Sequence, residues 1–164
     1  MATHNEIKKK IYMRNFIFGV EDSLVSTVGM LAGIAAAGLP KTNIFISSIV
    51  LIFVEAISMG IGSYLSEDGS EKNPKKKEQI KGAIIMFCSY FLAGFIPLAP
   101  YLLFDIKQAL LISIIATLFA LFGLGITDAT IMKKRIIKNG VKMLILGGAA
   151  IGVGMLVGKI AGIN

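Results

Sequence analysis

Five apolar runs, each long enough to cross a lipid bilayer, dominate this sequence. A helix needs roughly 20 residues to cross the hydrocarbon core. We place the predicted spans at about 15–38, 42–65, 82–104, 107–129 and 140–162. Lipid offers no hydrogen-bonding partner to an open strand, so these runs are predicted to be helices. The predicted fold is all-α, a polytopic membrane protein with five transmembrane helices in a single transmembrane domain, 1–164.

The composition fits a bilayer better than it fits a nucleic acid. Hydrophobic residues make up 55% of the chain and charged residues only 16%, and the net charge is +7. In a soluble protein that charge would suggest nucleic-acid binding. Here the basic residues fall between apolar runs, so lipid is the expected partner and nucleic acid is not. The single cysteine, Cys88, can form neither an internal disulfide nor a CxxC zinc site.

The basic residues gather at alternate connections between the predicted spans. Of the 17 Lys and Arg residues, fourteen lie in the N-terminal flank, in the linker 66–81 or in the region 133–142. The other three are Lys41, Lys107 and Lys159. Loops rich in Lys and Arg stay in the cytoplasm. The N-terminus is therefore predicted to be cytoplasmic and the C-terminus to lie on the opposite side, in the cell membrane of a prokaryote or a vacuolar-type membrane of a eukaryote.

Four acidic residues fall inside predicted spans, namely Glu21, Asp22, Glu55 and Asp128. An ionised carboxylate near mid-bilayer costs about 2.5–3.5 kcal/mol on insertion scales. One explanation is an ion pair that joins two helices, but no Lys or Arg lies deep in any span. The remaining counterparts are a metal ion, a proton or water.

Depth and spacing single out a candidate metal site of Asp22, Glu55 and Met59. Asp22 lies roughly 10 Å from the cytoplasmic end of the first span, and Met59 roughly 9 Å from that end of the second. Glu55 is one turn deeper than Met59 and on the same helix face. Carboxylates with a thioether favour a later transition metal such as Fe²⁺ over a purely hard ion. The alternative for Met59 is core packing, the usual role of methionine.

Other residues of the sequence are candidates for proton transfer, helix packing or a helix break. Glu21, Asp128, Glu67 and Asp68 are candidates for proton carriers or accessory acids. Gly29 and Gly33 form a small-xxx-small pair that lets another helix approach closely. A pair of prolines in 95–103 is expected to kink or break the third span.

Four stretches resemble the vacuolar iron transporter family over about 12–162. They are GVEDSLVSTVGMLAGIAAAG, EAISMGIGSYLSE, FIPLAPYLL and GGAAIGVGMLVGKIAG. The resemblance implies a five-span dimeric transporter that moves Fe²⁺, and often Mn²⁺, out of the cytoplasm in exchange for protons. Asp22 matches the first-span transport carboxylate of the family, and Met59 matches its metal-contacting methionine. No cofactor beyond the transported ion is implied. We expect a homodimer with two-fold symmetry in which the Gly29 and Gly33 faces of two first spans lie near the axis.

This chain departs from the family pattern in two ways. Glu55 stands where the family often has glycine, and Ser63 stands where it often has glutamate. Iron-transporting members often carry a Glu-rich cytoplasmic domain between the second and third spans, which the linker 66–81 is too short to contain. Metal capture before transport must then be reduced or achieved differently, and the choice between Fe²⁺ and Mn²⁺ stays open.

Two other functional classes were weighed. A membrane scaffold or assembly subunit would explain Asp128 but gives Glu55 no reason to lie in a span. An intramembrane protease is suggested loosely by GLGITD, 123–128, but the spacing is wrong and no second catalytic aspartate matches it in depth. We therefore predict a transporter and not an enzyme.

The predicted topology is testable by labelling. Single cysteines introduced at Lys76 and Asn164 should react with an impermeant reagent from opposite sides of the membrane, because an odd number of spans separates the linker from the C-terminus. Equal labelling of both positions from one side would mean that the span count is wrong.

Overall fold

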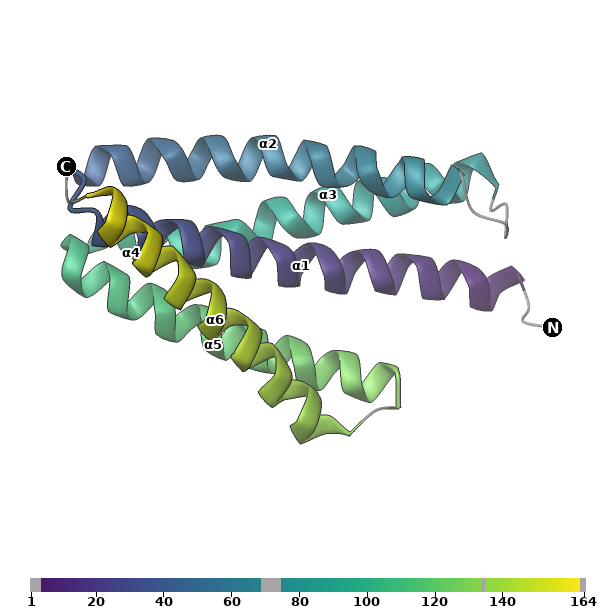
Figure 1. Cartoon of the computed structure of the whole chain (residues 1–164). Coiled ribbons are helices and arrows are strands. Elements are labelled where there is room, and N and C mark those ends of the chain that lie inside the picture. The colour runs from purple at the N-terminus through teal and green to yellow at the C-terminus, as the bar shows by residue number, and fades with distance from the viewer. Residues whose placement is uncertain (1–3, 69–74, 134, 163–164) are drawn as a thin grey trace.

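The computed structural model describes residues 4–68, 75–133 and 135–162, and every regular element in these ranges is a helix. The helices are α1 (His4–Ala36), α2 (Lys41–Asp68), α3 (Lys76–Leu98), α4 (Pro100–Leu103), α5 (Ile106–Ile131) and α6 (Ile136–Ala161) (Figure 1). Five segments of the described ranges are long and apolar enough to cross a membrane, with α3 and α4 counted together. The predicted all-α, five-span fold is confirmed, and the chain is an integral membrane protein.

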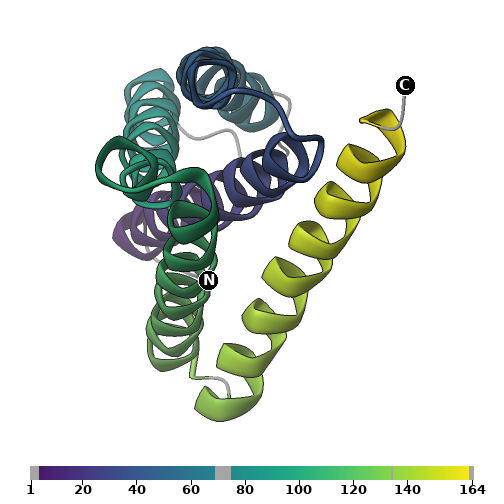
Figure 2. The same ribbon diagram turned by 90° about the vertical axis from the view of Figure 1, so that its left-hand side faces the viewer.

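α1 is the central helix of the bundle. It packs most extensively on α3 and α6 and also contacts α5 and α2. α2 lies against α3, and α6 lies against α5, so α2 and α6 are on different sides of α1 (Figure 2). α1 begins at the end of the bundle where α2 ends and α6 begins, and α6 ends at the opposite end (Figure 1). Which of these ends faces the cytoplasm stays a prediction.

The connection between α1 and α2 is a tight turn made by Gly38. Its φ of +74° lies in the left-handed region, which glycine adopts without steric cost. The amide of Gly38 donates to the carbonyl of Ala35 at 3.1 Å, and the amide of Leu39 donates to that of Ile34 at 3.4 Å. This is the Schellman pattern of a helix C-terminus. α2 then starts directly after Pro40, which keeps α1 and α2 adjacent and antiparallel.

Two prolines interrupt the third span, as the sequence predicts. α3 ends just after Pro97, and α4 begins at Pro100. Each proline lacks an amide hydrogen, so a carbonyl one turn earlier loses its helical partner. Ala99 between them keeps helical dihedral angles, with φ −52° and ψ −42°. The prolines therefore remove hydrogen bonds, while the backbone between α3 and α4 stays in the right-handed helical region. The Pro97 carbonyl accepts a 2.7 Å hydrogen bond from the Ser113 hydroxyl, which ties α3 to α5.

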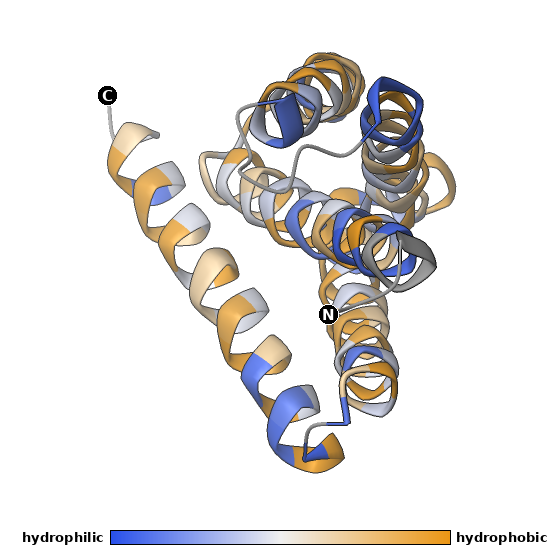
Figure 3. Ribbon diagram, turned by 90° about the vertical axis from the view of Figure 1, so that its right-hand side faces the viewer, coloured by the Kyte–Doolittle hydropathy of each residue, from blue (hydrophilic) through white to orange (hydrophobic). Residues whose placement is uncertain are grey.

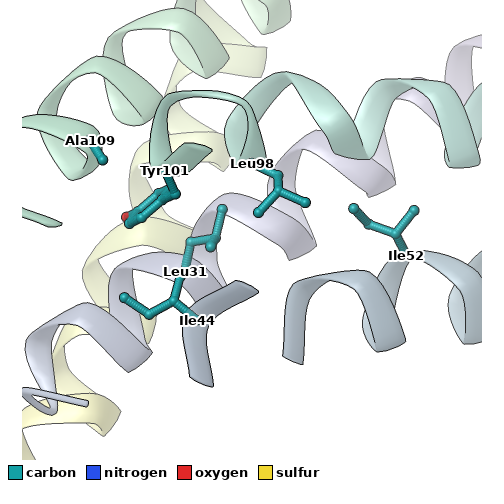
Figure 4. Packing of buried hydrophobic residues seen from close by; sticks show 6 residues of the cluster. All are labelled: Leu31, Ile44, Ile52, Leu98, Tyr101 and Ala109. Atoms are coloured by element: carbon teal, nitrogen blue, oxygen red, sulfur yellow. The ribbon is translucent and has the colours of Figure 1, made fainter. Parts of the chain in front are cut away.

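A buried apolar cluster contains residues of α1, α2, α3, α4 and α5 and lies near the end of the bundle where α4 is found (Figure 4). Its members are Leu31, Ile44, Ile52, Leu98, Tyr101 and Ala109. Lipid tails are as apolar as these side chains, so van der Waals fit rather than escape from water holds the cluster together. Figure 3 shows hydrophilic residues gathered near the helix ends on the side where α1 begins, and hydrophobic residues along the helices. The outward apolar side chains are therefore suited to contact lipid.

α6 packs through a row of glycines. Gly140 and Gly147 lie against α5, where an added Cβ would overlap the rings or methyl groups of Phe122 and Leu121. Seven residues is close to two helical turns, so glycines at this spacing stay on one face. The row continues onto α1 at Gly154 and Gly158, and backbone there meets backbone.

The partner of Gly29 and Gly33 on α1 is α6 of the same chain. An added Cβ at Gly33 would lie 2.8 Å from the carbonyl oxygen of Gly154. We expected a second copy of the first span at this face, and the structure corrects that expectation. Small residues indicate that some helix can approach closely, but they do not indicate which helix it is.

The contact between α1 and α6 yields a stability prediction. A Cβ at Gly158 would overlap the carbonyl oxygen of Gly33, which is backbone and cannot swing away. Gly158→Ala should lower the free energy of unfolding by about 1–3 kcal/mol, the usual cost of overpacking. Gly152→Ala, on the same helix with open space around it, should leave stability unchanged or raise it. Thermal unfolding of the detergent-solubilised protein measures both, and equal melting temperatures would contradict the contact.

Candidate functional site

Two carboxylates from different helices lie within electrostatic range of each other in the membrane-spanning part of the protein. Asp22 lies on α1 and Glu55 on α2, and both side chains are half-buried. Glu55 precedes the fully buried Ala56, which places it at the edge of the α2 face that packs inward. The two carboxylates interact electrostatically. Neither takes part in a described ion pair with lysine or arginine.

A pair of hydroxyl groups completes this site from α1 and α3. The Ser26 hydroxyl lies one turn from Asp22 and is 2.7 Å from the Tyr90 hydroxyl. The Ser23 hydroxyl donates to the Tyr90 carbonyl at 2.6 Å, so two serines on one face of α1 fix Tyr90. The Tyr90 side chain is fully buried, and its hydroxyl is within electrostatic range of both Asp22 and Glu55. The site thus contains two acids and two neutral hydroxyls.

Tyr90 was missed in the sequence because tyrosine alone is a weak signal. Tyrosines are common near membrane interfaces, where ring and hydroxyl face different environments. The better signal was the pair Ser89–Tyr90 in the middle of an apolar span, since buried hydroxyls need partners. The partner could have been sought in Ser26, which shares a helix face with Asp22.

Asp22 also borders a groove between α1 and α6. The groove has a volume of about 570 Å³, and its lining includes Ser26, Gly29 and Met30 of α1 and Val153 of α6. Asp22 is the only charged residue among the residues that line it within the described chain. The carboxylate therefore has Glu55 in one direction and an apolar, open groove in another.

Met59 lies one turn from Glu55 and is also half-buried. Its neighbours Ser58 and Gly62, which share that face by spacing, are exposed. The thioether is thus at the flank of α2 and outside the buried core row of that helix.

Glu21 and Asp128 belong to a different pocket from Asp22. Consecutive residues on a helix point about 100° apart, so Glu21 borders a pocket beside α5 and the first half of α6, while Asp22 borders the groove between α1 and the second half of α6. Glu21 and Asp128 line a pocket of about 270 Å³ together with Arg14, Asn139 and Lys142. Asp128 is buried and accepts a 2.8 Å hydrogen bond from the Asn139 amide. The packing of α6 on α5 therefore encloses this candidate accessory acid.

Glu67 is a buried carboxylate in an ion pair with Arg14, which joins α2 to α1. It lies twelve residues beyond Glu55, about 18 Å along α2. Asp68 is exposed at the end of the same helix. The structure therefore places these two candidate acids away from Asp22. The sequence analysis predicted no ion pair between helices, and Glu67 forms one with Arg14.

Further polar contacts join the same ends of α1, α2 and α3. Lys8 pairs with Glu78 at 3.0 Å, and Tyr12 donates a hydrogen bond to that carboxylate. The Asn15 amide donates to the Ser63 hydroxyl at 2.8 Å, and both groups are buried. These contacts hold together the start of α1, the end of α2 and the start of α3, on the side of the carboxylate pair where α1 begins.

The described residues contain no group of three or more His, Cys, Asp and Glu side chains that could hold a metal ion. Two carboxylates can attract a divalent ion, and the Ser26 and Tyr90 hydroxyls and the Met59 thioether are the further donors on this side of the bundle.

Comparisons with known proteins agree with this architecture. Residues 13–79 and 67–159 match the family model described as the VIT family. A protein named vacuolar iron transporter 1 from Arabidopsis thaliana is 22% identical over 90% of this chain and 85% of its own length. Vacuolar iron transporter homolog 4 from the same plant is 25% identical, with 93% and 85% covered. An uncharacterised protein of Methanocaldococcus jannaschii is 28% identical, with 85% of each covered.

The first of these alignments also shows a length difference. It extends over 213 residues, more than the 164 residues of this chain, so the plant protein contains additional residues. The two segments that match the family model meet at 67–79, which is the connection between α2 and α3.

The two buried tyrosines provide a matched test of the site geometry. Tyr90→Phe removes a hydroxyl that is hydrogen-bonded to Ser26, so it should lower the free energy of unfolding by about 0.5–1.5 kcal/mol. The Tyr101 hydroxyl is buried and meets no hydrogen-bonding partner in the described chain, so Tyr101→Phe should be neutral or stabilising. Thermal unfolding in detergent compares them. A larger loss for Tyr101→Phe would contradict the contact between Tyr90 and Ser26.

Proposed function

This chain belongs to the VIT family, and on that premise we propose that it carries a divalent transition metal ion, Fe²⁺ or Mn²⁺, out of the cytoplasm in exchange for protons. The observation that carries the proposal is the meeting of Asp22 and Glu55 within spanning helices. The printed names of the plant relatives refer to iron, which supports a metal cargo.

The carboxylate pair suits an ion that must bind and leave. Two negative charges in a low-dielectric region repel one another, and a cation between them removes both the repulsion and the desolvation cost. A divalent ion neutralises the pair in one step. The Ser26 and Tyr90 hydroxyls contribute neutral oxygens that replace part of the hydration shell without adding charge.

Protons provide the alternative means of neutralising the same pair. A carboxylate surrounded by lipid and protein is stable when it is protonated or bound to a cation, and unstable when it is bare. Metal and protons therefore compete for Asp22 and Glu55. Exchange of one for the other is the coupling step that we propose.

Met59 gives the site a softer donor. A thioether adds little to the binding of a hard ion but favours later transition metals over Mg²⁺ and Ca²⁺. Its place one turn from Glu55, on the half-buried flank of α2, allows it to meet an ion that has left the carboxylates or is approaching them.

Two copies of the chain would complete the ligand set. One chain supplies two carboxylates, and a two-fold axis beside the open flank of α1 would supply four. Since Gly29 and Gly33 are covered by α6, we place this axis at the flank of α1 that carries Asp22, with the second half of α6, which borders the same groove, as part of the interface. The dimer remains a proposal, as does the transport of protons.

The transport proposal is tested in proteoliposomes loaded with a metal-sensitive dye and a pH dye. Asp22→Asn should abolish the flux of every metal, because it removes half of the charge that attracts the ion. Glu55→Gln should reduce proton exchange more than metal flux. Asp105→Asn, the same change at an exposed helix start, should leave both unchanged. Wild-type exchange by Glu55→Gln would make this carboxylate structural.

Met59→Leu separates a ligand role from packing. Leucine keeps the size and apolarity of methionine, so the protein should fold and still carry Mn²⁺, while Fe²⁺ flux should fall several-fold because the sulfur is lost. Met155→Leu, a half-buried methionine of α6 in the core, should keep the wild-type ratio of the two fluxes. An unchanged ratio in Met59→Leu would mean that the thioether only packs.

A further inference from the structure

The corner between α5 and α6 carries a group of basic residues. Lys133, Arg135 and Lys138 are exposed there. No Asp or Glu follows Asp128, so 129–164 contains only basic charged residues. The other basic stretches have acids close by: Lys8 and Arg14 pair with glutamates, and the lysines at the start of α3 adjoin Glu78. The exposed charges of the α5–α6 corner are therefore cationic, while Asp128 lies buried in the neighbouring pocket.

An apolar surface of α6 starts directly beside these cations. Ile137 is 75% exposed and Ile145 65% exposed, and Val141 between them is exposed as well. Together with Arg135 and Lys138 these side chains line a hollow of about 1240 Å³. In Figure 3 the hydrophilic start of α6 passes into a hydrophobic stretch along the outer side of the same helix. The cations at the start of α6 suit an anionic headgroup, and the apolar surface that follows suits a hydrocarbon chain. An amphiphile contains both parts.

We infer that this corner binds an anionic phospholipid, with the phosphodiester headgroup on Arg135 and Lys138 and an acyl chain along Ile137, Val141 and Ile145. Cations next to a spanning helix attract anionic lipid headgroups, and each is worth about fivefold in binding near the membrane surface. A soluble anion would use the charges but leave the apolar hollow in contact with water. A nucleic acid would not enter the lipid-facing side of α6.

The position of this site gives it a structural consequence. The first half of α6 contacts α5 through Gly140 and Gly147, which bring backbone close but contribute no side chain of their own. A lipid on the outer side of α6 would press this half against α5. Lys142 also borders the pocket of Glu21 and Asp128, so it is left out of the lipid site. The inference depends on neither metal transport nor dimerisation.

The test uses the full chain in mixed micelles with equal amounts of phosphatidylglycerol and phosphatidylcholine. Native mass spectrometry counts the lipids retained. The wild type should retain phosphatidylglycerol in excess, and the excess should shrink as salt rises. Arg135→Gln with Lys138→Gln should lower the phosphatidylglycerol-to-phosphatidylcholine ratio at least tenfold. Lys76→Gln with Lys77→Gln, equally exposed cations at the start of α3, should keep the wild-type ratio.

Each other outcome overturns the inference. Equal retention of the two lipids by the wild type means that there is no anionic lipid site. An equal loss in the Lys76 and Lys77 variant means that general interface charge, and not this corner, attracts the lipid. Displacement of phosphatidylglycerol by 10-fold excess inorganic phosphate means that the corner is a soluble-anion site. Should the Arg135 and Lys138 variant fail to fold, the lipid preference and salt series of the wild type, with the phosphate competition, still decide the matter.

Discussion

Two carboxylates within electrostatic range of each other inside a membrane are the constraint on which the rest of this structure depends. Asp22 and Glu55 repel each other, and the surroundings of spanning helices cannot solvate them as water does. Such a pair persists only where the helices that carry it are held from other sides. α1 is held in this way, since α3 and α6 pack on it extensively while its contact with α2 is smaller.

The contacts that hold α1 are polar on one side and close-packed on the other. Ser23 and Ser26 bind Tyr90 of α3, which fixes the turn of α1 that carries Asp22. Gly29 and Gly33 let α6 reach the backbone of the next turns. Arg14 and Glu67 join α1 to α2 at the end where α1 begins. The carboxylate pair thus lies between the Arg14–Glu67 ion pair and the glycine contact of α1 with α6. Both contacts limit how far the helices can move apart in this segment.

The sequence predicts the spans well because length and apolarity are set by the bilayer. It predicts their ends less well: α1 begins at His4 rather than near 15, because Lys8 and Arg14 find carboxylates on neighbouring helices. Pairings between helices are the part that one sequence does not contain. Gly29 and Gly33 look equally suited to a second copy or to α6, and only the tertiary arrangement distinguishes the two.

The candidate site divides along the same line. Helical spacing places Met59 one turn from Glu55 and Ser26 one turn from Asp22, so each half could be derived within one helix. Two other features depend on contacts between residues more than fifty positions apart. Tyr90 contacts Ser26, and Glu67 pairs with Arg14. Glu21 and Asp22 illustrate the limit, since they adjoin in sequence and yet face different pockets.

The central claim is that Asp22 and Glu55 bind the same ion, and a double-mutant cycle on metal affinity tests it most directly. Mn²⁺ binding to the purified protein can be followed by the loss of the paramagnetic resonance signal of the free ion, in the wild type, Asp22→Asn, Glu55→Gln and the double variant. If the two carboxylates share one ion, each single change should weaken binding at least tenfold, and the double change should weaken it little further. Effects that simply multiply, or an affinity that Glu55→Gln leaves unchanged, would contradict a shared ion.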